Sequence, residues 1–273
     1  MKKEKNAARY LLLSLVLLLF CAAQGYAFEK TIPLPKCAEI GGAASYEGLS
    51  NAPDSKYFAA QDYFTKKSEG SLVILSGFRT YQQSTETSCG PAAALMVLSY
   101  YGRDKNIDEL RLVKEMKILN KRTKNGQIGT STAKLVDWFR AHGFRVESSL
   151  KRAGKDGLSF QDPDAMKTFF IKKLSSGTPI MVEDFTWGGH WRVIIGYDTL
   201  GTKQVSDDVI IFADSYDTWD HKQDGYNVQN AEYFFYTWRD IDMLPRNQRL
   251  QQWLTVSPAP SVKKQDCGKL KTY

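Results

Sequence analysis

The sequence lacks several features that would place it in a large class of proteins. It contains neither a CxxC nor an HxxxH pair, so the usual ligand spacings of a zinc site are missing, and we expect neither metal nor cofactor. It also contains no nucleotide-binding motif, internal repeat or low-complexity tract. The chain has only three histidines and four cysteines. Few side chains can therefore carry thiol or imidazole chemistry.

A membrane span of ordinary length is also missing. The main apolar run, residues 11–23, is shorter than the ~20 residues that a transmembrane helix needs, but it matches the apolar part of a secretory signal. Basic residues precede it and small residues follow at 25–27. We therefore expect residues 1–27 to be a secretory signal peptide and the mature chain to begin at Phe28, in a secreted or periplasmic protein with no stable membrane span. An uncleaved anchor is the alternative.

Length and composition favour a single catalytic domain. A chain of 273 residues with 42% hydrophobic residues can bury one substantial core. We expect an N-terminal surface leader at 28–75, a domain at 76–256 and a C-terminal tail at 257–273. The basic clusters behind the net charge of +7 contain no interleaved aromatic residues, so nucleic acid is not an expected partner. In an oxidising compartment, Cys37 and Cys267 could form a disulfide between the two flanks.

Cys89 is the first candidate for chemistry. Thr87 or Ser88 could cap a helix that begins beside it, Pro91 suits the first turn, and Gly102 would end the helix. A thiol at a helix N-terminus faces free N–H groups, and with a nearby histidine its pKa typically falls to roughly 3.5–7.5. The placement favours a nucleophile, and a buried structural cysteine is the alternative.

The partners expected for this thiol come from two later strands. His190 opens the apolar stretch 191–197, a second strand spans 208–214, and the polar residues between them suit a hairpin turn. A turn centred near Thr202 places His190 opposite Asp214, where a carboxylate could orient an imidazole. The alternatives are a strand-end histidine bound to a carbonyl group and an aspartate that caps a turn.

A neutral amide could complete the site. Gln83, six residues before Cys89, could donate an N–H to an oxyanion together with the Cys89 backbone amide. Gln82 is its rival, and a solvated loop glutamine is the alternative for both. Around these positions the pattern predicts helices at 107–119, 130–142 and 162–174 and strands at 144–149 and 179–183.

Together these motifs resemble a known family. The chain has Gln83, then five residues, then Cys89-Gly90-Pro91-Ala92 and an aliphatic helix; later come Gly189-His190-Trp191-Arg192-Val193 and Phe212-Ala213-Asp214. This combination is similar to the C39 and C39-like cysteine peptidases. The resemblance implies an α+β, papain-like fold in which an N-terminal helical part carries the nucleophile and packs on an antiparallel sheet that carries the histidine and aspartate. It also implies Cys89 as nucleophile, His190 as base, Asp214 as orienting acid and Gln83 in the oxyanion hole.

The chain departs from the part of this family that processes bacteriocin leaders. Those members usually have an aspartate before the cysteine and precede a transporter, whereas this chain has Ser88 there and no transporter motif. We therefore do not expect leader cleavage. The sequence predicts an exported thiol hydrolase that cleaves peptide or amide bonds in a peptide or protein substrate. The alternatives are an acyl or amide transferase on the same fold and a catalytically silent peptide-binding domain.

Overall fold

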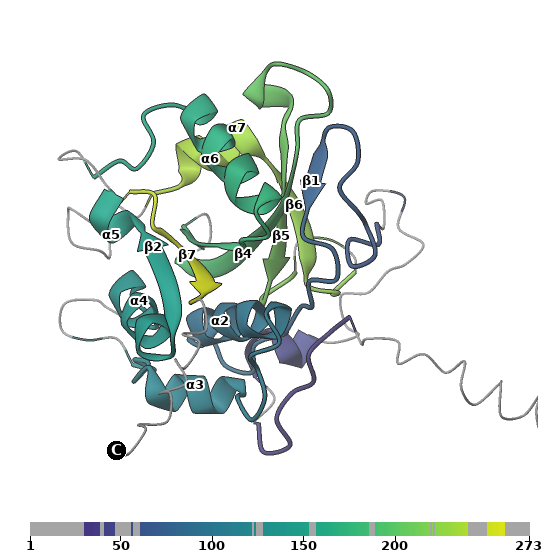
Figure 1. Ribbon diagram of the computed structural model, residues 1–273. Coiled ribbons are helices and arrows are strands. Elements are labelled where there is room, and N and C mark those ends of the chain that lie inside the picture. Colours follow the sequence, from purple (N-terminus) through teal and green to yellow (C-terminus); the bar gives the residue numbers. More distant parts are fainter. Residues whose placement is uncertain are drawn as a thin grey trace, which may run out of the picture. The chain divides into compact units, whose positions relative to one another are not determined.

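The structure is a computed structural model that describes most of the chain from residue 30 onward (Figure 1). The described residues are 30–38, 41–46, 56, 61–121, 123, 128–152, 157–185, 189–218, 220, 222–239 and 250–259. By their contacts, residues 31–273 form one unit, and the description below concerns that unit. The expected signal segment at 1–27 and Cys267 lie outside the described residues. Of the helices that are described, none is long and apolar enough to cross a membrane.

An antiparallel sheet forms the centre of the fold. In the part of the chain that is described it has seven strands in the order β2-β7-β3-β4-β5-β6, and β1 pairs with β4. The strands are β1 Leu72–Ile74, β2 Phe144–Ser148, β3 Ile180–Asp184, β4 His190–Asp198, β5 Val209–Asp214, β6 Tyr226–Asn230 and β7 Trp253–Pro258. The central strands are almost wholly buried, which fits their nearly continuous apolar sequence.

Helices cover both faces of this sheet. They are α2 Cys89–Tyr100, α3 Glu109–Glu115, α4 Thr132–Ala141, α5 Ser149–Arg152, α6 Pro163–Ser175 and α7 Ala231–Thr237, with the short 3₁₀ helices η1 Gly42–Tyr46 and η2 Val205–Asp207. In Figure 1, α2, α3 and α4 lie below the sheet, and α6 and α7 lie above it. The structure is therefore α+β with α2 packed on an antiparallel sheet, and the predicted fold class is confirmed.

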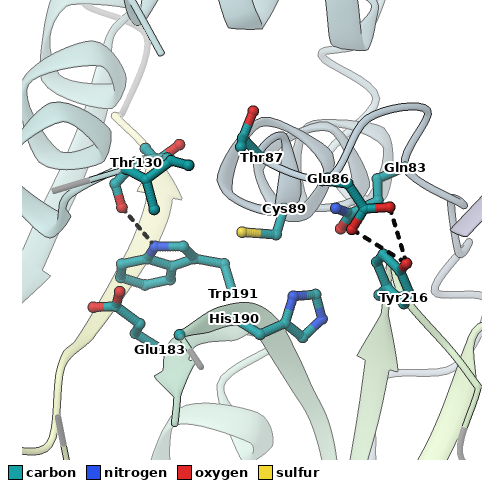
Figure 2. Close-up of a pocket in the computed structure, with 12 residues that line it drawn as sticks. Gln83, Glu86, Thr87, Cys89, Thr130, Glu183, His190, Trp191 and Tyr216 are labelled. Carbon is teal, nitrogen blue, oxygen red and sulfur yellow. Dashed lines mark hydrogen bonds between the residues drawn. The ribbon is translucent and has the colours of Figure 1, made fainter. Parts of the chain in front are cut away.

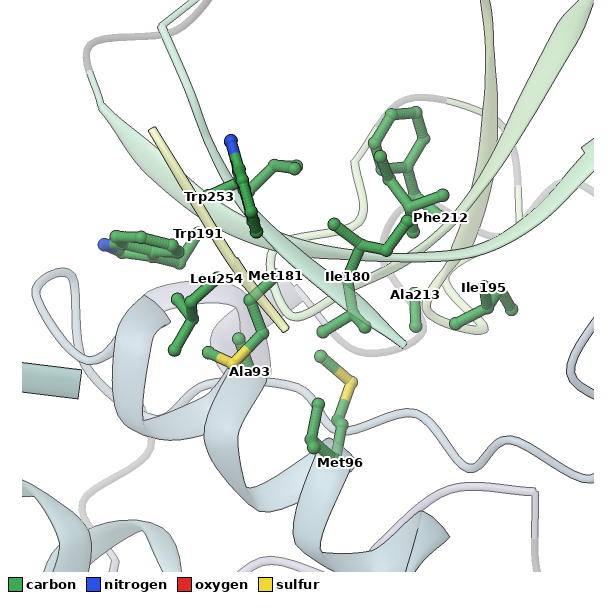
Figure 3. Close-up of a cluster of buried hydrophobic side chains, with 14 of the residues drawn as sticks. Ala93, Met96, Ile180, Met181, Trp191, Ile195, Phe212, Ala213, Trp253 and Leu254 are labelled. Carbon is green, nitrogen blue, oxygen red and sulfur yellow. The ribbon is translucent and has the colours of Figure 1, made fainter. Parts of the chain in front are cut away.

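Helix α2 is buried more completely than its sequence suggested. The helical spacing of Ala93, Met96, Val97 and Tyr100 in the sequence predicts one buried face, but every residue from 89 to 98 is buried. Figure 3 shows Ala93 and Met96 directed toward the side chains of the sheet. The prediction of a single face was wrong because α3 packs against α2 in addition to the sheet. A helix enclosed by neighbours needs apolar side chains on several sides.

The ends of the other elements follow their capping residues. The helices predicted at 130–142 and 162–174 correspond to α4 and α6, and Asp162 caps α6 by accepting a hydrogen bond from Ala165 N at 2.7 Å. The helix predicted at 107–119 is shorter at both ends. Asp108 caps α3 at its start, and Lys117 adopts a φ of 51°, a left-handed conformation that cannot continue a helix.

Part of the expected surface leader belongs to the core. β1 pairs with β4, and Ile32 N donates to Thr80 O at 2.7 Å. Ala43 and Ala44 are buried. Cys37 is exposed and free, and because Cys267 lies outside the described residues, the disulfide between them stays a prediction that intact mass with and without reductant would test.

Candidate active site

Cys89 is the first residue of α2 and lies in the wall of a cavity of about 360 Å³. Its side chain points into this space, with His190 across from it on β4 (Figure 2). Twelve residues line the cavity: Gln83, Glu86, Thr87, Cys89, Ile128, Gly129, Thr130, Glu183, Gly189, His190, Trp191 and Tyr216. Residues from segments far apart in the sequence therefore meet around one thiol.

The expected cap of α2 is not formed. Ser88 occupies the N-cap position, but its side chain accepts no hydrogen bond from the helix. Its hydroxyl donates instead to Glu109 Oε1 at 2.5 Å. The prediction that Ser88 or Thr87 would cap the helix was wrong: the Ser88 oxygen accepts from Thr85 Oγ1 at 2.8 Å rather than from a helix N–H, and its proton goes to Glu109.

The imidazole and the acid meet as expected, but in a different register. His190 Nε2 lies 2.6 Å from Asp214 Oδ1. Asp214 is opposite Arg192 rather than His190, because the connection between the strands includes η2 and the pairing shifts between Ile194 and Gly196. A displacement of two residues keeps a side chain on the same side of a sheet, and diagonal neighbours remain within reach of long side chains.

The contact between His190 and Asp214 defines which ring nitrogen faces the thiol. An ionised carboxylate only accepts hydrogen bonds, so His190 Nε2 carries the proton that points to Asp214, and Nδ1 is left for Cys89. Burial by itself would lower the pKa of His190, but the charge and hydrogen bond of Asp214, together with a hydrogen bond to Cys89, raise it well above its usual range. The surroundings therefore favour the imidazolium.

Both carboxylate oxygens of Asp214 accept hydrogen bonds. It is fully buried, and burial alone would raise its pKa, but His190 and then Arg192 and the Tyr216 backbone lower it below its ordinary value. Tyr216 N donates to Oδ1 at 2.8 Å, and Asn227 Nδ2 donates to Oδ2 at 2.8 Å. A hydrogen-bonded carboxylate of this kind stays ionised, and it can therefore hold the imidazolium.

A polar network behind Asp214 was missed at the level of sequence. Asn227 on β6 connects Asp214 to the buried Arg192, whose Nη1 donates to Asn227 Oδ1 at 3.2 Å. Arg192 also pairs with Asp184 and lies over the Phe212 ring at 3.8 Å. An arginine within an apolar strand was a usable signal, because a buried charge requires partners.

Gln83, rather than Gln82, faces the cavity. Its side chain is held at both ends: Ser215 Oγ donates to Oε1 at 2.8 Å, and Nε2 donates to Thr85 O at 2.7 Å. An amide nitrogen carries two protons, so one N–H of Gln83 is available beyond the bond to Thr85. Gln82 does not line the cavity. The structure thus places the Gln83 amide beside Cys89 in a defined orientation.

Gly90 lets the wall of the cavity approach α2 closely. A Cβ atom at position 90 would lie 2.6 Å from Thr130 Cβ, closer than real side chains come. Thr130 O in turn accepts a hydrogen bond from Trp191 Nε1 at 2.8 Å (Figure 2). This chain of contacts joins the start of α2, the segment around Thr130 and β4, and it holds Cys89 and His190 at a constant separation.

The chain also resembles known proteins. The model of the Peptidase C39-like family matches residues 75–242. Among solved structures, the chain is similar to the peptidase domain of Streptococcus ComA, a bifunctional ABC transporter involved in a quorum-sensing pathway; sequence identity is 16% and the TM-score is 0.37. That similarity covers 66% of this chain and 98% of the other. No curated protein matches. Because the family match extends over more than half of the sequence, this chain belongs to the Peptidase C39-like family.

Proposed function

We propose that the protein is an exported cysteine peptidase in which Cys89 attacks the carbonyl carbon of a peptide or amide bond. The observation that carries the proposal is the hydrogen bond between His190 Nε2 and Asp214 Oδ1, at 2.6 Å, in a cavity that Cys89 also lines. Such a pair leaves the second ring nitrogen of the imidazole for the thiol. Family membership supports a peptide substrate.

The reaction follows from these positions. The Cys89 thiolate forms a bond to the carbonyl carbon, and the electron pair of the C=O bond moves to its oxygen. The Gln83 amide and the Cys89 backbone N–H stabilise that oxyanion. His190 then transfers a proton to the leaving amine as the C–N bond breaks, which leaves a thioester. Water attacks the thioester, His190 accepts a proton from it, and the C–S bond breaks to release the acid.

A peptide library tests the reaction. The full chain, its Cys89→Ala variant and a Cys37→Ala control are each incubated with the library, and fragments are identified by N-terminal sequencing. Cys37 is exposed and does not line the cavity, so we expect cleavage by the wild type and the control but not by Cys89→Ala. Equal fragment patterns in all three samples would contradict the proposal. Products extended by an added amine would indicate the transferase instead.

Alkylation separates a peptidase from a silent peptide-binding domain. After reduction of the protein and removal of the reductant, so that Cys37 is a free thiol, we expect iodoacetamide to label Cys89 much faster than Cys37, because an imidazolium that neighbours a thiol promotes its reactive anion. Peptide mapping of the labelled protein measures both rates in the same sample. Labelling of Cys89 no faster than that of Cys37 would favour the binding domain.

Export is the other part of the proposal. It rests on the basic residues and apolar run at the start of the sequence. We expect protein recovered outside the cytoplasm to begin at Phe28, as determined by N-terminal sequencing. Protein found only inside the cytoplasm and beginning at Met1 would contradict export.

A further inference from the structure

Glu109 is a buried carboxylate that no part of the proposed reaction uses directly. It is the first residue of α3 and has no exposed surface. Its oxygens accept hydrogen bonds from Tyr81 Oη at 2.6 Å, Ser84 N at 3.0 Å, Ser84 Oγ at 2.5 Å and Ser88 Oγ at 2.5 Å. A buried charge is costly without such partners, and here every partner comes from the segment before α2.

The two serines flank the residues proposed for catalysis. Ser84 directly follows Gln83, and Ser88 directly precedes Cys89. One carboxylate therefore binds both ends of the loop that joins the proposed oxyanion donor to the nucleophile. Thr85 Oγ1 also donates to Ser88 Oγ at 2.8 Å, which orients the Ser88 hydroxyl proton toward Glu109. Charge-assisted hydrogen bonds hold geometry more tightly than neutral ones.

Glu109 also forms a hydrogen bond with Ser88, the residue at the N-cap of α2. A serine at the N-cap normally accepts a hydrogen bond from the N–H of the second or third helical residue. The third residue here is Pro91, which has no N–H, and Ser88 does not bond to the second: its oxygen accepts from Thr85 Oγ1 while its proton is donated to Glu109. The Ser88 side chain does not cap the helix, so backbone N–H groups beside Cys89 are left for a substrate oxygen.

We propose that Glu109 is a positioning residue that holds Ser84 and Ser88 so that Gln83 and the first amides of α2 form the oxyanion hole. The proposal rests on the peptidase reaction proposed above. Glu109 does not line the cavity into which the Cys89 thiol points. It acts through the two serines, and its loss affects the stabilisation of the oxyanion rather than substrate binding.

The test compares Glu109→Gln with Ser88→Ala, using the full chain. Glutamine keeps the shape of the side chain but presents an amide group to hydroxyl and N–H donors. We expect kcat for peptide cleavage to fall about 10- to 100-fold in Glu109→Gln, less than the roughly 100- to 1000-fold loss when an oxyanion-hole donor is removed outright, with KM changed less than about threefold. Alkylation of Cys89 by iodoacetamide forms no oxyanion, so its rate should change less than about threefold.

Matched variants separate positioning from a loss of folding. Tyr81→Phe removes another donor to Glu109 that is not adjacent to Gln83 or Cys89, so it should lower the melting temperature and leave kcat unchanged. Ser88→Ala should reproduce part of the loss in kcat, and the double variant should be no slower than Glu109→Gln alone. Ser88→Ala is a small change that should leave the fold intact. If Glu109→Gln does not fold, the kcat of Ser88→Ala alone tests the proposal.

Two outcomes would overturn the proposal. Either kcat stays within about threefold of the wild type in folded Ser88→Ala and Glu109→Gln, or kcat and alkylation fall together in proportion to the melting temperature. A wild type that cleaves no peptide would overturn the peptidase itself. An active wild type with unaffected variants would reject only the role of Glu109.

Discussion

His190 is the residue whose chemistry depends most on its surroundings. Burial opposes its positive charge, and Asp214 more than offsets that effect. Because the folded-state pKa of His190 is raised, its ion pair stabilises the fold fully below the ordinary histidine pKa of about 6.5 and is lost as pH rises through the folded value. The His190 imidazolium should therefore persist into mildly alkaline solution.

Asp214→Asn tests this dependence at the level of one residue. An amide cannot stabilise the imidazolium by charge, so we expect the alkaline limb of kcat/KM for peptide cleavage, which requires protonated His190, to move to lower pH by about one to three units. Rates measured across the pH range give the shift. Asp198→Asn, at the far end of β4, is the control and should leave the limb in place. An unmoved limb in Asp214→Asn would show that the acid does not set the charge of His190.

At the scale of elements, local capping explains where several helices begin. Asp162 accepts from Ala165 N, Asp108 from Arg111 N at 2.8 Å and Asn230 from Tyr233 N at 2.9 Å. Each is a polar residue just before a helix, a signal that lies in adjacent residues. Helix α2 is the exception. Its N-cap residue, Ser88, makes no capping hydrogen bond and donates its proton to Glu109.

The cap of α6 gives a prediction at this scale. Asp162→Ala removes the acceptor for Ala165 N, and we expect the free energy of unfolding to fall by about 0.5–2 kcal/mol with no change in peptidase activity. Chemical denaturation measures the change. Asp164→Ala, also exposed and in the first turn, should cost less because it loses only an interaction with the helix dipole. Equal losses in the two variants would show that the cap does not stabilise α6.

At the scale of the whole molecule, aromatic side chains connect α6 and α7 to the sheet. The Phe170 ring of α6 packs against Tyr197 of β4, Phe234 of α7 and Trp238, with ring centroids 6.0–6.5 Å apart. It has no exposed surface. These contacts connect α6, α7 and the strand that begins with His190, so they stabilise the sheet as a platform for the site.

Phe170→Ala should therefore destabilise the whole unit. We expect a loss of about 3–5 kcal/mol in the free energy of unfolding, because a buried cavity replaces the ring. Urea denaturation followed by tryptophan fluorescence measures it. Tyr236→Ala, at a side chain that is 62% exposed, should cost far less. A similar loss in both variants would contradict the central place of Phe170 in the core.

The sequence by itself predicted the strands β2, β3, β4 and β5, the helices α2, α3, α4 and α6, the family and the candidate site residues Gln83, Cys89, His190 and Asp214, but not β1, β6, β7, α5 or α7. These depend on periodicity, on caps and on short motifs around Cys89, His190 and Asp214, all of which lie in neighbouring residues. Gln83 was separable from Gln82 only in three dimensions, since spacing along a loop does not say which amide faces the cysteine.

Only the tertiary structure decided the register of β4 against β5 and the burial of α2 on several sides. It also decided the roles open to Asn227 and Glu109, which act on residues from other segments of the chain. The pairing register depends on a bulge and a longer connection, and the buried polar contacts depend on which segments meet in space. No local pattern contains that information, because hydrogen bonds between distant segments exist only after the sheet and helices have packed.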